Sequence, residues 1–259
     1  MADKRQQMLA FWSERARRYR CDPRANTEDI WLREVEIACV DKIIKAHRPA
    51  RILDFGCANG YSTLRLAKAN PGCSFLGLDL NADMIAVAKE LAEREPCPNA
   101  TFCQADILQA DLRQTFDFIY AIRVFQNIES PEMQRHLFDR LHTLLDSDGL
   151  FYYIESYADG YASLNRDRAK MNLPPLPIHP HLTLLTDEFD AYVSSRMETL
   201  ERSSPSSSYY LITRLLYSYI AMMNNEPIDY NHPIHQVAAI VPQIGEYGPQ
   251  RAALCRKKD

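Results

Sequence analysis

The sequence predicts an α/β fold, a doubly wound and mostly parallel sheet of seven strands with a helical lid. Between residues 51 and 155, short apolar runs alternate with longer segments whose apolar residues follow a helical period. This is the pattern of a parallel sheet covered on both faces. The composition, 46% hydrophobic and 25% charged over 259 residues, is sufficient for a sizeable core. Only 8 residues are glycine, which excludes collagen-like and turn-dense all-β proteins.

The same pattern predicts each element in order. The first 47 residues contain two helices, of which the second begins near Asn26 and Thr27 and ends before Pro49. Its first turn is expected to hold Glu28 and Asp29. Strands are then expected at 51–55, 74–79, 100–104, 116–121 and 150–155, and helices at 61–69, 81–94 and 131–145. After residue 157 we expect helices at 158–172, 186–193, 207–223 and 232–241, a sixth strand at 197–202 and a last strand at 251–256.

Charge, cysteine content and apolar runs narrow the class of protein. The net charge of −4 disfavours a general nucleic-acid binder, which usually carries a basic excess. The N-terminus has no apolar run behind its charges, and the longest apolar stretches fall short of the ~20 residues of a membrane span. The seven cysteines are scattered without a CxxC pair, so neither a zinc ribbon nor a disulfide framework is indicated. We therefore expect a cytoplasmic protein without a membrane or nucleic-acid partner.

The turn after the first strand, residues 54–60, contains the most informative motif. Glycine at such a turn lets the backbone approach a ligand closely. A dinucleotide fold would need G-x-G-x-x-G/A, but Tyr61 occupies the third position of that pattern. The alternative pattern, acidic-x-G-x-G-x-G, is matched by Asp54, Gly56 and Gly60, with Ala58 in place of the middle glycine.

This second pattern resembles the first motif of class I S-adenosylmethionine-dependent methyltransferases, and three further matches follow in order. Asp79 ends the second strand, Ala105-Asp106-Ile107 follows the third, and residues 116–128 resemble the fourth motif of the family. All four lie at the carboxyl ends of consecutive strands, where open α/β sheets bind ligands. The resemblance covers residues 50–156 and implies a Rossmann-like methyltransferase fold. A second set of segments, residues 123–128, 154–156 followed by 164–168, and 230–234 before 245–249, resembles bacterial small-molecule methyltransferases.

The resemblance also implies a role for individual residues. S-adenosyl-L-methionine would be the cofactor and S-adenosyl-L-homocysteine the product. Asp79 would hold the ribose hydroxyls, Asp106 would reach the adenine amino group, and Arg123 would lie under the sulfonium. The full set of expected cofactor-binding residues is Tyr19, Arg33, Gly56, Cys57, Gly60, Asp79, Leu80, Met84, Ala105, Asp106, Ile107, Ile122, Arg123 and Gln126.

We interpret the chain as one methyltransferase domain, residues 1–259, made of four consecutive parts. These are an N-terminal helical cap (1–47), a cofactor-binding core (48–156), a lid or acceptor-side insertion (157–242) and the last strand (243–259). Tyrosines concentrate after residue 150, where Tyr209 and Tyr210 suit either an acceptor pocket or the packing of one helix. Arg166 and Arg168 would suit a carboxylate- or phosphate-bearing acceptor.

The acceptor is predicted to be a small molecule, methylated by in-line displacement. Residues 121–124 lack the Asn/Asp-Pro-Pro-Tyr sequence with which nucleic-acid methyltransferases hold base amines. A hydroxyl acceptor would need a base, and the candidates are Glu155 at a strand end, His179 and His232. The spacings of His179 to His181 and of His232 to His235 are too loose to predict a metal site.

The expected activity is therefore O-methylation of a small molecule, with several alternatives open. A small-molecule N-methyltransferase, an enzyme acting on a protein side chain, and a cofactor-binding sensor or inactive partner would all keep the same cofactor motifs. The apolar stretches 7–16 and 207–223 leave open a homodimer surface or burial under the lid.

Overall fold

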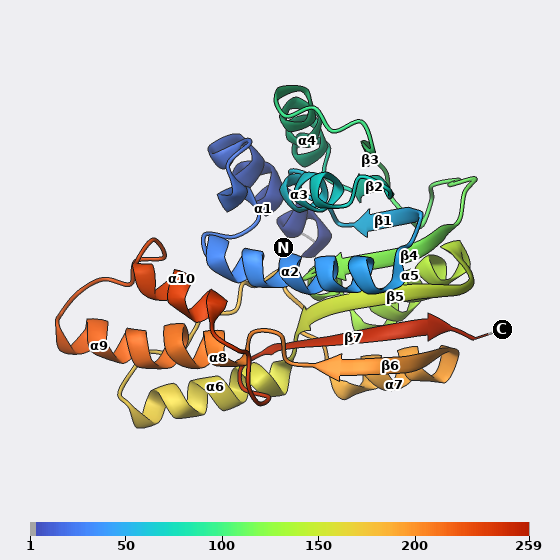
Figure 1. The fold of residues 1–259 in the computed structure, drawn as a ribbon. Coiled ribbons are helices and arrows are strands. Elements are labelled where there is room, and N and C mark those ends of the chain that lie inside the picture. Colours follow the sequence, from blue (N-terminus) through green and yellow to red (C-terminus); the bar gives the residue numbers. More distant parts are fainter. Residues whose placement is uncertain (1–3, 259) are drawn as a thin grey trace.

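The computed structural model describes residues 4–258 and contains one seven-stranded sheet, in the order β3-β2-β1-β4-β5-β7-β6 (Figure 1). The strands are β1 (Arg51–Phe55), β2 (Ser74–Asp79), β3 (Ala100–Gln104), β4 (Phe116–Ile122), β5 (Leu145–Ser156), β6 (Met197–Ser203) and β7 (Gln250–Lys257). Neighbours are parallel except around β7, which is antiparallel to both β5 and β6. The predicted fold class is confirmed, since each predicted strand overlaps an observed one.

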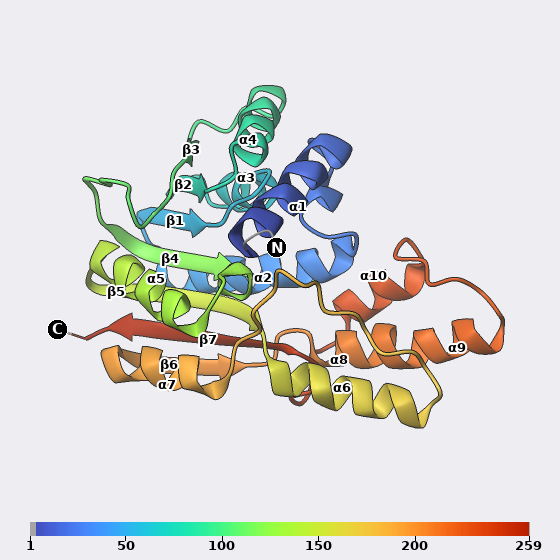
Figure 2. The same ribbon diagram turned by 180° about the vertical axis from the view of Figure 1, so that it is seen from behind.

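Helices cover both faces of the sheet and one of its ends. α2, α3 and α4 lie on one face and α5 and α7 on the other, while α6, α8, α9 and α10 gather at the end toward which β1 and β4 point (Figures 1 and 2). The helices are α1 (Lys4–Tyr19), η1 (Pro23–Ala25), α2 (Ile30–His47), α3 (Tyr61–Ala69), α4 (Ala82–Arg94), η2 (Phe125–Asn127), α5 (Pro131–Leu144), α6 (Ala158–Lys170), α7 (Asp187–Arg196), α8 (Ser207–Tyr210), η3 (Leu211–Leu216), α9 (Tyr217–Met223) and α10 (Pro233–Ile240).

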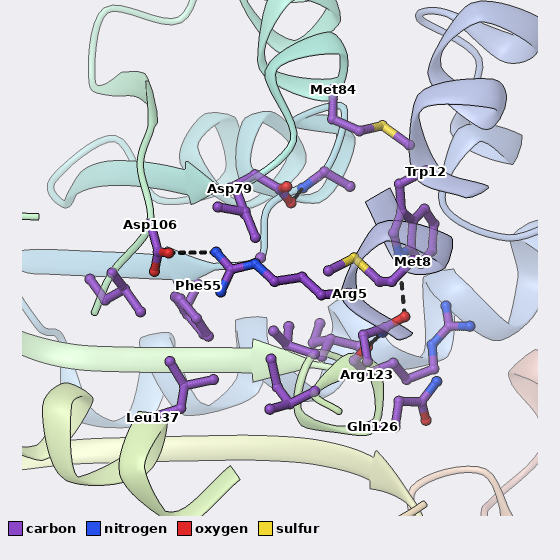
Figure 3. A pocket seen from close by; sticks show the side chains of 18 of the residues that line it. Arg5, Met8, Trp12, Phe55, Asp79, Met84, Asp106, Arg123, Gln126 and Leu137 are labelled. Carbon is purple, nitrogen blue, oxygen red and sulfur yellow. Dashed lines mark hydrogen bonds and ion pairs between the residues drawn. The ribbon is translucent and has the colours of Figure 1, made fainter. Parts of the chain in front are cut away.

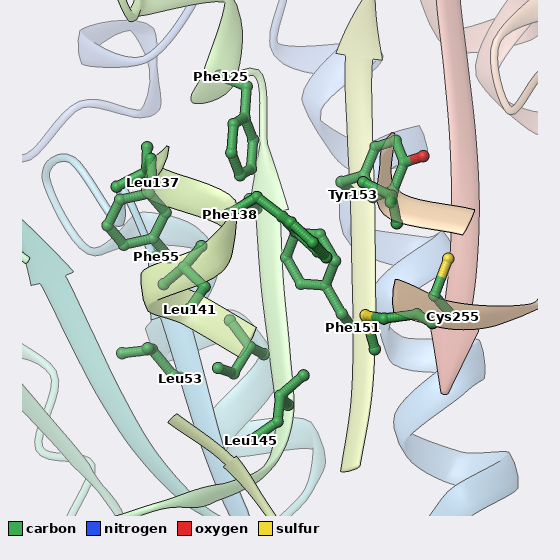
Figure 4. Close-up of a cluster of buried hydrophobic side chains, with 14 of the residues drawn as sticks. Leu53, Phe55, Phe125, Leu137, Phe138, Leu141, Leu145, Phe151, Tyr153 and Cys255 are labelled. Carbon is green, nitrogen blue, oxygen red and sulfur yellow. The ribbon is translucent and has the colours of Figure 1, made fainter. Parts of the chain in front are cut away.

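The central strands are apolar on both faces because each face carries its own helical layer. Successive residues point to opposite sides, so Ile52 and Phe118 pack with the layer of α2, while Leu53 and Ile119 pack with the layer of α5. Phe138 of α5 is 1% exposed and lies in the second layer (Figure 4). The sheet is thereby buried on both sides, and its carboxyl ends are left for a binding site.

Two helices differ from their predicted form. The second helix begins at Ile30, later than predicted, because Asp29 is its N-cap and accepts a hydrogen bond from the Leu32 amide at 3.2 Å. The preceding residues form the separate short helix η1. The predicted helix over 207–223 is continuous, but its middle, η3, has π-helical hydrogen bonding.

Replacing Phe138 by alanine should lower the free energy of unfolding by about 3–5 kcal/mol, because it leaves a cavity in a closely packed layer. Urea unfolding followed by circular dichroism measures the change. Ile240→Ala is the matched control, since Ile240 is 76% exposed and its truncation should change the free energy by less than about 0.5 kcal/mol. Equal effects of the two substitutions would contradict the assignment of this core.

Candidate cofactor and acceptor site

A pocket opens at the carboxyl ends of β1, β2 and β4, against α1 (Figure 3). The parallel strands bring the predicted motifs together there, as expected for an open α/β sheet. Eleven of the fourteen predicted cofactor residues line it: Arg33, Gly56, Asp79, Leu80, Met84, Ala105, Asp106, Ile107, Ile122, Arg123 and Gln126. The other three, Tyr19, Cys57 and Gly60, do not.

The turn between β1 and α3 has a tight backbone. Gly56 and Gly60 have φ angles of +77° and +74°, and Ala58 also has a positive φ, of +47°. A side chain at Gly56 would meet Val124 Cγ2 at 2.4 Å, so glycine is needed there to let the turn approach the loop after β4. Ala58 adopts the left-handed region that its side chain disfavours, and its amide donates to Asp79 Oδ2 at 2.8 Å.

Asp79 and Asp106 place two carboxylates along a slot whose wall is otherwise mostly apolar apart from Arg5. Asp79 accepts amide hydrogen bonds from Ala58 and Asn81, yet burial raises the pKa of its carboxyl to about 6. The slot between the two acids is apolar, with Phe55, Leu80, Met84, Ile107 and Leu137 in its wall. Acceptors at each end of an apolar slot fit an adenosine group, which has hydroxyls and an exocyclic amine around a flat apolar ring.

Helix α1 forms the outer wall of this slot and contributes residues that the sequence motifs do not predict. Arg5, Met8 and Trp12 face the pocket, and Arg5 Nη2 lies 2.5 Å from Asp106 Oδ2 (Figure 3). Trp12 Nε1 donates to Asn127 Oδ1 at 3.2 Å and so ties α1 to the loop after β4. Only the spacing of apolar residues in α1 could have indicated a buried face, and that spacing does not identify a ligand.

The opposite end of the pocket is polar and cationic. Arg33 of α2 and Arg123 at the end of β4 both pair with Glu36, a carboxylate that is 0% exposed. Glu36 also accepts a hydrogen bond from Gln250 Nε2 at 2.6 Å. Arg123 has a φ of +57°, an unusual backbone for arginine that is often found at functional sites. Two guanidinium groups thus share one buried counter-ion at the pocket wall.

Glu155, the predicted base, lies beneath the pocket and does not line it. Its side chain accepts hydrogen bonds from three consecutive amides, those of Val124, Phe125 and Gln126, at 2.7, 2.8 and 3.1 Å. Burial raises the pKa of Glu155 to about 8, although these three hydrogen bonds oppose the rise. This geometry is that of a residue that positions the loop after β4.

The other predicted catalytic residues also lie away from the pocket. His179 stacks on His181 and packs against Phe11, and His232 Nδ1 accepts a hydrogen bond from the Ile234 amide at the start of α10. Neither imidazole reaches the strand ends, because each is engaged in the packing or capping of its own segment.

The predicted substrate residues lie in α6 and α8, away from the pocket. Arg168 is buried and donates to the carbonyl of Pro174, while Arg166 is exposed on α6. The Tyr209 hydroxyl donates to Asp29 Oδ1 at 2.5 Å, and Tyr210 is buried in the cluster that α8 forms with α2, α6 and α10. None of the four lines the pocket.

The three cofactor candidates outside the pocket have local structural roles. The Tyr19 hydroxyl donates to Glu28 at 2.6 Å, and burial raises the pKa of the Cys57 thiol well above its usual range. Gly60 is the N-cap of α3. Arg15, one helical turn before Tyr19, donates to the carbonyls of Arg24 and Ala25.

Within residues 4–258, no group of three or more His, Cys, Asp or Glu side chains is arranged to hold a metal ion. No helix in that part of the chain is both long and apolar enough to cross a membrane.

Asp79→Asn should weaken the binding of S-adenosylhomocysteine by about 10- to 100-fold, because a charged acceptor is lost. The variant should also change the dependence of stability on pH. A carboxyl group whose folded pKa is raised to about 6 lowers the free energy of unfolding as pH rises through that value. Asparagine has no such group, so the stability of Asp79→Asn relative to the wild type should increase between pH 4 and pH 8. Calorimetric titration and urea unfolding at both pH values measure these effects. An unchanged affinity would contradict the assignment of Asp79 to the cofactor.

Arg5→Gln should bind S-adenosylhomocysteine about two- to fivefold more tightly, because the partly exposed ion pair with Asp106 must open before an adenine amino group can reach that carboxylate. Arg20→Gln is the matched control, since it removes another ion pair, with Glu90, that joins the N-terminal segment to α4. Weaker binding by Arg5→Gln would show instead that Arg5 contacts the cofactor.

Comparisons with known proteins agree with this geometry. Malonyl-[acyl-carrier protein] O-methyltransferase of Anoxybacillus flavithermus is 33% identical over 132 residues, 51% of this chain and 46% of that protein. Trans-aconitate 2-methyltransferase of Rhodopseudomonas palustris is 33% identical over 102 residues, 39% of this chain and 37% of that protein. The chain spans about half the length of the curated relatives that it matches first.

Solved structures match over the whole chain at low identity. N-methyltransferase NodS from Bradyrhizobium japonicum, in complex with S-adenosyl-L-homocysteine, has a TM-score of 0.62 at 15% identity and covers 99% of this chain and 100% of its own. Magnesium protoporphyrin IX methyltransferase from Synechocystis has a TM-score of 0.60 at 14% identity, covering 95% and 94%. These similarities show the fold. A family model described as methyltransferase domain matches residues 46–201, so the chain belongs to that family, as a class I member whose cofactor is S-adenosyl-L-methionine.

Proposed function

We propose that the protein transfers a methyl group from S-adenosylmethionine to an oxygen atom of a small-molecule acceptor. The cofactor supplies a methyl group activated by attachment to a sulfonium. Asp79 and Asp106 would hold the adenosine through its hydroxyls and its amine, with Leu80 and Ile107 against the ring. The turn at Gly56 would bring the backbone close to the amino-acid part of the cofactor.

The single observation that carries an oxygen acceptor is the charge at the polar end of the pocket. An amine acceptor is an ammonium ion before it loses its proton, and Arg33 and Arg123 would repel it there. An oxygen acceptor carries no such charge and can accept hydrogen bonds from guanidinium groups. Two relatives are named for the methylation of malonyl-[acyl-carrier protein] and of trans-aconitate. Their names support a small or acyl-linked acceptor.

Exclusion of water would come mainly from the N-terminal segment. Arg5, Met8, Trp12 and Asn26 contribute to the pocket wall, whereas no residue of 157–242 does. Thr183 still links that insertion to the site, because its amide donates to the Gln126 carbonyl at 2.8 Å and Lys4 Nζ donates to its hydroxyl at 3.1 Å. We propose that the segment 4–47 is the direct cover of the cofactor and that 157–242 support the loop after β4 from outside.

Incubation with methyl-labelled S-adenosylmethionine and an extract of the source cells, followed by mass spectrometry, tests this function. We expect label in a small molecule, with the new methyl group on oxygen. Asp79→Asn is the control for cofactor-dependent transfer. Label on nitrogen would overturn the choice of acceptor atom, and tight cofactor binding without transfer to any compound would favour a sensor or inactive partner.

A further inference from the structure

The cationic end of the pocket is held in place from three directions. Glu36 Oε2 accepts from Arg33 Nη1 at 3.3 Å and from Arg123 Nη2 at 3.1 Å, and Gln250 of β7 donates to its other oxygen. α2, β4 and β7 therefore fix the two guanidinium groups relative to each other. A pair of arginines held in this way is pre-organised for a planar anion, because little side-chain entropy is lost on binding.

The charges at this end do not cancel within the protein. Glu36 is the one carboxylate within ion-pair distance of either guanidinium among residues 4–258. Asp54 accepts a hydrogen bond from the Thr63 hydroxyl at 2.6 Å, and Arg15, which lies near Arg123, has its own acid, Glu28, at 3.7 Å. Two positive charges thus face one negative charge where the wall meets the pocket.

Several buried polar atoms at the same end have no hydrogen-bond partner. Asn26 has neither its amide oxygen nor its amide nitrogen engaged, and both Arg33 Nε and Gln126 Oε1 are unpartnered. Asn26, Arg33 and Gln126 are each at least 92% buried and all three line the pocket. Buried polar groups are rarely left unpaired in folded proteins, so these atoms indicate a polar ligand.

We propose that this end of the pocket is a carboxylate-binding subsite for the acceptor, so that the protein methylates a carboxylate oxygen of a small organic acid. This inference rests on the proposed function and narrows it. The guanidinium groups of Arg33 and Arg123 bind the carboxylate, and the Asn26 amide donates to it.

A carboxylate could come either from the acceptor or from the amino-acid end of the cofactor. The amino-acid end of the cofactor carries an ammonium beside its carboxylate, so it brings no net negative charge to the part of the wall where two guanidinium groups share one carboxylate. An acidic acceptor does bring a net negative charge. We therefore assign the subsite to the acceptor.

The chemistry of a carboxylate acceptor also matches the residues present. One carboxylate oxygen supplies the electron pair of the new C–O bond, and the C–S bond breaks with its pair kept by sulfur. No proton is released, so no base is needed, in contrast to a hydroxyl acceptor. The pocket accordingly works without the imidazoles of His179 and His232, which lie elsewhere.

The test uses the full-length protein loaded with S-adenosylhomocysteine, which measures acceptor binding without turnover. Succinate, glutarate and citrate are compared with succinamide and glutaramide by calorimetry. We expect the acids to bind at least about 10-fold more tightly than the amides, and Arg33→Gln and Arg123→Asn each to remove most of this preference. Asparagine is chosen at 123 because it tolerates a positive φ.

Two control variants distinguish the loss of a positive charge from damage to the fold. Arg33→Lys keeps a cationic partner for Glu36 and should retain an intermediate preference for acids. Arg113→Gln removes an arginine that is 90% exposed and should leave the preference unchanged. Binding of S-adenosylhomocysteine and of 5′-methylthioadenosine, which lacks the amino-acid end, is measured for each variant.

Three results would overturn the inference. Equal affinity for acids and amides would show that this end of the pocket does not select a carboxylate. Loss of S-adenosylhomocysteine binding in Arg33→Gln and Arg123→Asn, with 5′-methylthioadenosine unaffected, would assign the arginines to the cofactor. Transfer of label to an alcohol oxygen would reject a carboxylate acceptor and leave O-methylation standing, whereas transfer to nitrogen would reject both proposals.

Discussion

The arrangement of the pocket depends on the buried side chain of Glu155. A carboxylate in the interior is costly unless it is hydrogen-bonded, and here three successive amides of the loop after β4 donate to it. The loop is held on its other side by Gln134, whose Nε2 donates to the Phe125 carbonyl at 3.0 Å. Val124 is thereby placed against Gly56, and Gln126 and Arg123 face the pocket. One carboxylate of β5 thus connects the sheet to the turn at β1 and to the polar end.

The fold and half of the pocket could be predicted because their signals are local. A strand such as 74–79 is indicated by Phe75, Leu76 and Leu78 within six consecutive residues, and the role of Asp79 is suggested by its place at the strand end. The contact between Arg5 and Asp106 spans 101 positions, and no local pattern indicates it. For Glu155 the position could be predicted, but the role could not. Its place at a strand end is visible in the sequence, whereas its hydrogen-bond partners are set by the tertiary structure, and these partners determine what its carboxyl group can do.

Tyr209 of α8 and Arg214 of η3 stabilise the fold around a second buried acid. Asp29, the N-cap of α2, contacts His235 at 3.5 Å, pairs with Arg214 at 2.5 Å and accepts from Tyr209. Burial opposes these contacts, but together they lower the pKa of its carboxyl. Helices α8 and η3 are thus attached to α2, the helix that carries Arg33 and Glu36. Their aromatic side chains serve this attachment, and these helices support the polar end of the pocket from outside.

The contact between Trp12 and Asn127 also constrains the order of folding during synthesis. The two residues are 115 positions apart, so α1 leaves the ribosome long before the loop that it covers exists. At about 5–20 residues per second this delay is on the order of 6–25 s. Over that interval Met8 and Trp12 have no native partner in the loop after β4, and α1 can dock there only after β4 has emerged. The outer wall of the cofactor slot is therefore made well before the loop that it covers, and it settles only after that loop has emerged.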